Sequence, residues 1–453
     1  MTGTGAKPWP KMTTREEFQF IAELVLKCST ADHTQITLHD QDGGTTRFAN
    51  NQVIQNVNTR RGGVSVSVAF GARQGTATTT DFTAGSLRET VKRAEAIARV
   101  SPEDPEYLPP EGPQAYAACP ASRSETLKAG PAVRLEYANE AIGQCRMENM
   151  SAAGIVSSSR ASVGVAAGTG LLAFEERTEA RFSITVQAGD ATGWASAAHR
   201  SIDRLKVQER TLSAIHKAML GTEPQELPPG RYRVILEPAA VAGLWSWIIW
   251  MLDAKSYLKG TSPFAGKLKK RILDARLSLE NAPEHADLLG VGFTAEGLPS
   301  TASQWIHHGV LQQLAYDRFT ARSQQIATIP TLEAPRLSVE GASASSLPQL
   351  IKSTDRAILV TNFWYLRTVN PTDLTLTGMT RDGTFLVEKG EIVSAVKNFR
   401  FHESPLQAFQ RVEAWTPPME AVTSETGKLL VPAVVLPEFH FSSVTRFSFS
   451  HCR

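Results

Sequence analysis

Histidine spacing is the first test for chemistry, because a zinc peptidase usually presents two histidines four residues apart on one helix, with a glutamate beside the first as general base. No two of the ten histidines have that spacing, and none lies between His216 and His285. His307 and His308 are adjacent, and we expect them in a turn between two strands. The sequence therefore predicts no metal site in this chain.

Nucleophilic catalysis leaves no signature either. The G-x-S-x-G elbow of serine hydrolases is missing. The glycine string Gly168–Ala173 leads into a predicted strand, whereas a dinucleotide site requires a helix there. The cysteines have no metal-type spacing and are expected to be free thiols, as in a reducing cytoplasm: Cys28, Cys119, Cys145 and Cys452. We predict no catalytic residue, and His402 beside Glu403 is the pair that could still act as a base and its orienter.

Length and composition define a globular protein of more than one domain. The chain has 453 residues, of which 42% are hydrophobic and 20% charged, with a net charge of +2. This balance gives no preference for nucleic acid or an anionic membrane. The longest apolar stretch, Val241–Leu252, is shorter than the ~20 residues that span a bilayer. Because the first residues lack an apolar core, we expect no signal peptide and a cytoplasmic protein with no membrane or nucleic-acid partner.

The elements that must position any site begin with strands and helices of clear period. Thr34–His39 and Val64–Phe70 alternate between polar and apolar residues, which predicts a sheet with one buried face. Asp81–Val100 has helical spacing, and Ser86 with Glu89 suggests a capping box at its start. The pattern predicts a mixed α/β unit at the beginning of the chain.

A second unit follows a proline-rich linker. Ser101–Pro120 holds six prolines, which exclude a regular helix or a central strand. Pro131 suits the first turn of a helix, and Ile202–Leu220 has a second amphipathic pattern. Pro238–Met251 is apolar nearly all round, so it predicts a helix buried inside a larger domain. Farther on, Arg381–Gly383 carries a turn signal within strand-rich sequence.

These elements predict an α+β protein. We expect two small mixed N-terminal subdomains, each an antiparallel sheet with helices, and a large β-dominated C-terminal domain. The predicted boundaries are 1–105, 122–222 and 228–453.

Longer strings of the chain resemble the TldD/PmbA metallopeptidase family, once called modulators of DNA gyrase. Thr46–Arg99 is similar to the first domain of that family, and Leu236–Leu268 to the start of its C-terminal domain. Further similar strings are Gly297–Thr301, Tyr316–Arg322, Asn362–Phe385 and the C-terminal VPAVVLPEFHFSSVTRF. The resemblance covers most of the chain and is weakest at about residues 101–160.

The resemblance implies a heteromeric peptidase that acts on peptides and on unfolded polypeptides. The TldD-type member carries a HExxxH zinc motif on the helix that opens the C-terminal domain, and the TldE-type member lacks it. The corresponding helix of this chain carries apolar side chains, which have no lone pairs for zinc: Leu244, Trp245, Trp247, Ile248, Ile249 and Trp250. The chain therefore resembles the TldE type, with no cofactor of its own, zinc in a TldD-like partner, and no activity alone.

Members of the family enclose a chamber between two similar subunits. The resemblance implies that a subunit without the motif completes this chamber and helps to bind substrate, which an edge strand can do through main-chain hydrogen bonds. Our candidate chamber residues are Trp364, Tyr365, Arg367 and Asn370. The expected partner is a TldD-like zinc-bearing subunit, in a heterodimer or a higher assembly, and a homodimer is expected if the chain works alone.

Two alternatives stay open at this point. One is a non-enzymatic, homodimeric peptide-binding protein of the same fold. The other is an autonomous hydrolase with a dispersed metal site or nucleophile, for which Cys145 and His402 are the residues to test. A role in gyrase control rests only on the old family name, because the sequence has no DNA-reading element.

Overall fold

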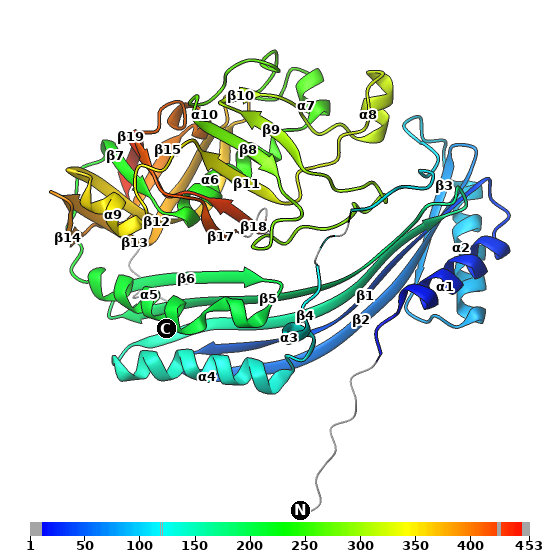
Figure 1. Ribbon diagram of the computed structural model, residues 1–453, viewed down its shortest axis with the longest axis horizontal. Coiled ribbons are helices and arrows are strands. Elements are labelled where there is room, and N and C mark those ends of the chain that lie inside the picture. The colour runs from blue at the N-terminus through cyan, green and yellow to red at the C-terminus, as the bar shows by residue number, and fades with distance from the viewer. Residues whose placement is uncertain (1–10, 118, 120, 424–426, 446–453) are drawn as a thin grey trace, which may run out of the picture.

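The computed structural model describes residues 11–117, 119, 121–423 and 427–445. A long, curved antiparallel sheet forms the N-terminal part, and a β-rich C-terminal domain lies over one side of it (Figure 1). The predicted α+β class is thus confirmed. Cys452 and the end of the C-terminal string used above, residues 446 and 447, lie outside the described residues.

The N-terminal sheet has six strands in the order β3-β2-β1-β4-β5-β6. Their bounds are His33–Ala49 (β1), Gln52–Phe70 (β2), Arg73–Thr79 (β3), Ser151–Ala167 (β4), Leu172–Ala188 (β5) and Ala191–His199 (β6). The central pairing joins β1 to β4 over fourteen residue pairs, from Gln35 with Ala167 to Phe48 with Gly154. The strands of the two predicted N-terminal subdomains therefore share one sheet, while the domain boundaries themselves stay a prediction.

Helices cover one face of this sheet in two separate groups. On β1, Ile36 and Leu38 pack against α1 and α2, and Phe48 packs against α4 and α5. Between these two cores, the same face carries Asp40 and Asp42. The helices are Arg15–Cys28 (α1), Ala84–Val100 (α2), Ser124–Leu127 (α3), Pro131–Met147 (α4) and Val207–Leu220 (α5). Strand alternation thus gives two apolar cores with a buried polar strip between them.

Two of the predicted helices begin differently from the sequence pattern. The helix expected at Asp81 begins at Ala84, and its cap is Thr83, whose hydroxyl accepts from the Ser86 amide. The predicted capping box on Ser86 was therefore wrong. The helix expected from Ile202 is interrupted at Lys206, which has φ +49. A 3-10 turn, Ile202–Leu205 (η1), precedes the break, and α5 follows it.

The C-terminal domain consists of two sheets. One has the order β10-β9-β8-β11-β18-β17, and the other has the order β12-β7-β19-β15-β13-β14, with an additional β12–β13 pairing. The pairings of β12, β7, β19, β15 and β13 therefore form a closed ring. The strands are Gly230–Leu236 (β7), Leu277–Asn281 (β8), Ser303–His307 (β9), Val310–Leu311 (β10), Pro335–Val339 (β11), Arg356–Asn370 (β12), Thr375–Glu388 (β13), Glu391–Ala395 (β14), Phe399–Glu403 (β15), Ala414–Trp415 (β16), Met419–Thr423 (β17), Gly427–Val431 (β18) and Val434–Val444 (β19).

The helices of this domain are few and mostly short. They are Pro238–Trp250 (α6), Ala254–Leu258 (α7), Arg318–Ser323 (α8), Leu347–Lys352 (α9) and Pro405–Ala408 (α10). The long helix α6 packs against β12 of one sheet and against β17 and β18 of the other. It therefore lies in the core between the two sheets (Figure 1).

The turn signal at Arg381–Gly383 is not a turn. These residues continue β13, where Asp382 has φ +56 and Gly383 has φ +132. The β12–β13 register shifts between Val360 and Asn362, opposite this point. A Cβ on Gly383 would lie 2.5 Å from the Thr361 hydroxyl, so the close approach of the two strands requires the glycine.

The proline-rich linker joins α2 to α3 within the N-terminal part and contacts the C-terminal domain on its way. It forms neither a helix nor a strand between Ser101 and Ala117, as its prolines predicted. Glu106 pairs with Lys255 at 2.8 Å, Glu111 with Arg318 at 2.6 Å, and the Tyr116 hydroxyl donates to the Gly297 carbonyl. The linker therefore binds along the C-terminal domain. Within the described ranges, no helix is long and apolar enough to cross a membrane.

Candidate functional site: a closed helix and an exposed aromatic–arginine face

Helix α6 is the element on which a metal site would be expected from the resemblance. Its first eleven residues are buried except for Ala239, and Trp245 packs edge-on against Phe409 with ring centroids 5.5 Å apart. The only side-chain hydroxyl on the helix, that of Ser246, donates to the Ala242 carbonyl. Because Trp245 and Trp247 offer only N–H donors, nothing on this helix can ligate zinc. No group of three His, Cys, Asp or Glu side chains in the described parts of the chain could hold a metal ion either.

The N-terminus of α6 is fixed by a bond between the two parts of the molecule. Glu237, the N-cap residue, accepts from Lys217 Nζ on α5 at 2.7 Å and from the Thr361 hydroxyl at 2.9 Å. On β13, the strand that pairs with the strand of Thr361, Asp382 accepts from the Thr192 hydroxyl of β6 at 2.8 Å. Burial raises the pKa of Asp382, and the charge of Arg381 opposes that rise. These carboxylates join the N-terminal sheet to the C-terminal domain.

All four residues predicted to line a chamber lie on β12, and three of them, Trp364, Tyr365 and Arg367, lie close together. The β12–β13 register shifts between Trp364 and Arg367, which marks a β-bulge. Phe363 and Leu366 both face the core, so the bulge places two consecutive residues, Trp364 and Tyr365, on the outer face. Their side chains are 47% and 56% exposed. A regular strand would have buried one of them, because its side chains alternate.

Arginines stack on both exposed rings. The Arg367 guanidinium lies 4.3 Å from the Tyr365 ring centroid, and the Arg381 guanidinium of β13 lies 4.5 Å from that of Trp364. The two rings are 5.5 Å apart. We call Trp364, Tyr365, Arg367 and Arg381 the aromatic–arginine face. It combines apolar surface with two guanidinium groups, of which that of Arg381 also lies 3.6 Å from the Asp382 carboxylate. Such a surface suits acidic and aromatic peptide groups.

The backbone at this face is strained. Tyr365 has φ +58, a left-handed conformation that is an outlier for a bulky side chain. Such strain costs roughly 1–3 kcal/mol and persists where the surrounding structure imposes it. The left-handed tyrosine is part of the bulge that places both aromatic rings on the outside of the domain.

Asn370, the fourth predicted residue, has a local role. It lies at the end of β12, where its side-chain oxygen accepts from the amide and hydroxyl of Thr372 at 3.1 and 2.8 Å. It therefore shapes the β12–β13 connection. Arg381 was missed by sequence reasoning, because only the strand register, which pairs it with Asn362, brings it next to Trp364.

The remaining candidates for catalysis have structural surroundings. The Glu403 carboxylate is buried and accepts from the Ser404 and His440 amides at 2.9 and 3.0 Å, so it does not orient His402. His307 and His308 lie at the predicted turn between β9 and β10. Burial raises the pKa of Cys145 to about 11, which opposes thiolate formation. Cys28, Cys119 and Cys145 are free thiols.

Two family models match the chain. Residues 229–443 match the PmbA/TldA metallopeptidase C-terminal domain, and residues 35–98 match PmbA/TldA metallopeptidase domain 1. A search of curated proteins found no match. Both matched models describe domains of one metallopeptidase family. More particularly, the chain belongs to the PmbA/TldD family.

Solved structures agree in fold over nearly the whole chain. TldE from Thermococcus kodakarensis is similar with a TM-score of 0.85 and 18% identity, covering 94% of this chain and 100% of its own. A proposed modulator of a DNA gyrase from Thermotoga maritima MSB8 has a TM-score of 0.83, 18% identity and the same coverage. A similar protein from Bacteroides thetaiotaomicron VPI-5482 has a TM-score of 0.82 and 17% identity, covering 96% of this chain and 100% of its own.

Proposed function

We propose that this chain is the non-metal, TldE-like subunit of a heteromeric TldD/TldE-type zinc metallopeptidase. In this role it completes a substrate chamber, binds peptide or unfolded polypeptide, and leaves the chemistry to a zinc-bearing TldD-like partner. The two chains form a heterodimer or a higher assembly in the cytoplasm, where the free thiols Cys28, Cys119 and Cys145 stay reduced.

One observation carries the proposal: the helix that would hold the metal is part of the core. The packing of α6 on both sheets of the C-terminal domain uses the side chains of Trp245 and Ile248, which are fully buried. A metal site keeps an open position for substrate. A helix closed in this way supports a binding role for the chain and a catalytic role for its partner.

The aromatic–arginine face supports substrate binding. Exposed tryptophan, tyrosine and arginine are the residue types that contribute most to protein and peptide interfaces. Arg367 donates to the Leu366 carbonyl and stacks on Tyr365, and among the described residues no carboxylate forms an ion pair with it. Its charge is therefore available to an acidic group of an extended peptide.

Reconstitution tests the division of labour. The chain and its TldD-like partner are purified separately, and peptide hydrolysis is measured for each alone and for the mixture. We expect hydrolysis only when both are present, together with a mixed complex in size-exclusion chromatography. Hydrolysis by this chain alone would contradict the proposal, and a stable homodimer that binds peptide but never associates with the partner would favour a non-enzymatic binding protein.

Peptide capture is tested on the isolated chain with fluorescently labelled, extended acidic peptides. Trp364→Ala is expected to weaken binding roughly tenfold, because a stacked aromatic residue of this kind contributes ~1–2 kcal/mol. Trp250→Ala is the matched control, since Trp250 is 59% exposed on the same domain and has no arginine stacked on it among the described residues. Equal binding by both variants would show that the aromatic–arginine face does not bind peptide.

A further inference from the structure

The outer face of the closed ring of strands continues beyond the aromatic–arginine face. Trp364 on β12 lies opposite Met379 on β13, and Met379 lies opposite Arg400 on β15. Phe399 and Phe401, on either side of Arg400, belong to the core, so strand alternation directs the Arg400 side chain outward. The register therefore places Trp364, Met379 and Arg400 in one row across three strands.

A second row runs beside the first. Arg367 on β12 lies opposite Thr377, which is two residues from Met379 along β13. Thr377 and Met379 are half-buried and alternate with buried residues of that strand, so both belong to the outer face. Arg367 and Arg400 are thus on opposite sides of β13, two strand spacings apart across the sheet and two residues apart along it. Their Cα atoms are therefore about 12 Å apart.

Arg367 and Arg400 differ from the other arginines on the outside of the ring. Both side chains are exposed, and among the described residues neither forms an ion pair with a carboxylate. The other three have acidic partners: Arg231 lies 3.5 Å from Glu438, Arg233 lies 3.0 Å from Glu413, and Arg381 lies 3.6 Å from Asp382. Two positive charges on this face are therefore available to another molecule.

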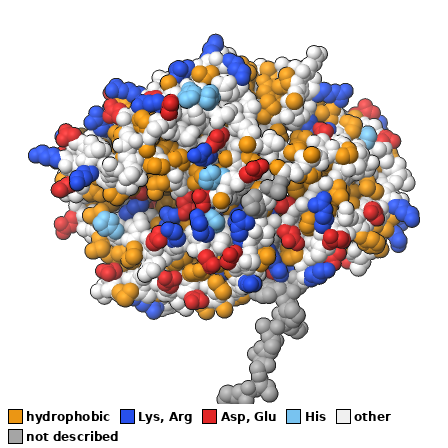
Figure 2. Space-filling model, viewed as in Figure 1, with side chains coloured by type: hydrophobic (Ala, Val, Ile, Leu, Met, Phe, Trp, Pro, Cys, Tyr) orange, Lys and Arg blue, Asp and Glu red, His pale blue; other side chains and the backbone are white. Residues whose placement is uncertain are grey.

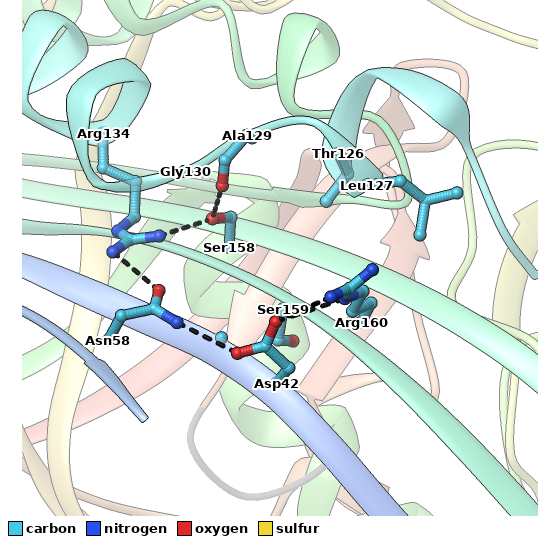
Figure 3. Close-up of a pocket in the computed structure, with 11 residues that line it drawn as sticks. Asp42, Asn58, Thr126, Leu127, Ala129, Gly130, Arg134, Ser158, Ser159 and Arg160 are labelled. Carbon is cyan, nitrogen blue, oxygen red and sulfur yellow. Dashed lines mark hydrogen bonds and ion pairs between the residues drawn. The ribbon is translucent and has the colours of Figure 1, made fainter. Parts of the chain in front are cut away.

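A buried arginine of the N-terminal sheet shows the contrasting arrangement. Arg134 lies in the polar strip between the two apolar cores and is only 1% exposed. It donates to the Ser158 hydroxyl, the Val57 carbonyl and the Asn58 side-chain oxygen at 3.0, 3.1 and 3.1 Å (Figure 3). Its acceptors all belong to the chain itself, whereas the exposed pair on the ring faces solvent.

We propose that Arg400 acts with the aromatic–arginine face to select peptides that carry two acidic side chains about 12 Å apart. This inference rests on the proposed function of peptide binding. An extended peptide advances ~3.3 Å per residue, so the two acidic residues are three or four positions apart. One carboxylate pairs with Arg367 and the other with Arg400, while the segment between them lies against Trp364 and Met379. Since the thioether of Met379 adapts to different partners, the spacing of charge is selected and not a fixed sequence.

An acidic peptide suits this face better than a nucleic-acid strand does. A single strand carries one phosphate charge for every ~3.4 Å, and proteins that bind it present a continuous basic groove. The face offers two guanidinium groups without a carboxylate partner, and the chain as a whole has a net charge of +2. Two separated charges match two acidic side chains.

Peptide titrations on the full chain test this selection. The probes are fluorescent peptides with two glutamates one to six positions apart in a neutral sequence, and a glutamine version of each. Affinity is expected to be greatest at a separation of three or four positions. At that spacing it should exceed the affinity of the glutamine version roughly tenfold, because each exposed ion pair contributes a factor of up to about five. Equal affinity at every spacing would overturn the proposal.

Substitutions that keep an aliphatic stem locate the two charges. Arg367→Met and Arg400→Met are each expected to reduce the preference for the two-glutamate peptide over its glutamine version about threefold to fivefold. Arg356→Met is the matched control, because Arg356 lies at the start of β12 and pairs with Glu388 at 3.4 Å, so its loss should leave the preference intact. An undiminished preference in Arg400→Met would overturn the proposal.

The same titrations separate this inference from the proposed function. Trp364→Ala is expected to weaken both the glutamate and the glutamine peptides. If it does so while Arg400→Met keeps the full preference for glutamate, peptide binding stands and the acidic selection is overturned. If no peptide binds the chain, the binding role itself fails. A single-stranded oligonucleotide that displaces the peptides and binds more tightly would also overturn the proposal, because the face would then recognise phosphate groups.

Discussion

Two aromatic clusters of the C-terminal domain have similar composition and opposite surroundings. On α6, Trp245 and Trp247 are buried between two sheets. On β12, Trp364 and Tyr365 are exposed, and arginines cover their rings. Figure 2 shows one face of the molecule, on which hydrophobic and charged side chains are interspersed. The comparison teaches that backbone geometry, here a bulge with a left-handed residue, decides whether an aromatic residue stabilises the fold or becomes available to a ligand.

The largest effect on stability is expected for the buried aromatic cluster of α6. Trp245→Ala should lower the free energy of unfolding by about 3–5 kcal/mol, because it leaves a cavity among fully buried neighbours. Chemical denaturation measures this loss. Trp364→Ala should change stability by about 0.5 kcal/mol or less. Similar losses for both variants would remove the distinction between the clusters.

The bond at the start of α6 is the next test. Lys217→Met leaves the Glu237 carboxylate buried without its charge partner and should cost about 3 kcal/mol. Adding Glu237→Gln should recover part of that loss, because the unpaired charge is removed. A double-mutant cycle from denaturant unfolding gives the coupling between the two residues. Additive losses would show that the pair does not hold the N-terminal sheet to α6.

Acid should weaken the packing around the buried helix α6. Asp274 accepts from Arg276 and the Val412 amide beside the Phe409 segment, and the Arg276 hydrogen bond lowers the pKa of Asp274 to about 2 from 3.8. Since the folded-state value is depressed, this stability is present above about pH 4 and is lost as the pH falls through about 2. The contribution is about 2 kcal/mol. Thermal unfolding of the chain and of Asp274→Asn should differ by this amount at pH 6 and converge near pH 2, and a constant difference would contradict the assignment.

At the exposed cluster on β12, a substitution should raise stability and weaken peptide binding. Tyr365→Gly relieves a left-handed tyrosine and should raise stability by about 0.5–1 kcal/mol, while peptide binding falls through loss of the ring. Unfolding and peptide titration on the same preparation measure both quantities. Lower stability with unchanged binding would mean that the strained residue serves the fold alone.

Periodicity predicted much of this fold, and the failures have local causes. The alternation of Val64–Phe70 and the apolar run after Pro238 identified a half-buried strand and a buried helix. The pattern failed at Arg381–Gly383, since a turn signal and a bulge use the same residue types. It also failed at Ser86, because capping depends on where the first helical hydrogen bond forms.

The candidate site was only partly predictable. The string containing Trp364, Tyr365 and Arg367 was found from its resemblance to the family, but a regular strand in that place would have buried one of the two aromatic residues. Their joint exposure follows from the bulge, and the contribution of Arg381 follows from strand register. Both depend on pairing between segments, which no local pattern records. The same holds for the buried Arg134, whose hydrogen-bond partners lie on two other elements, β2 and β4.

Zinc content is the most direct test of the proposal that this chain is a non-metal subunit. The chain, purified without any partner and washed with chelator, is analysed by elemental mass spectrometry. The proposed role predicts zinc well below one atom per chain. Zinc near one atom per chain that survives the wash would contradict it and would direct attention to His307, His308, His402 and His440 as ligands.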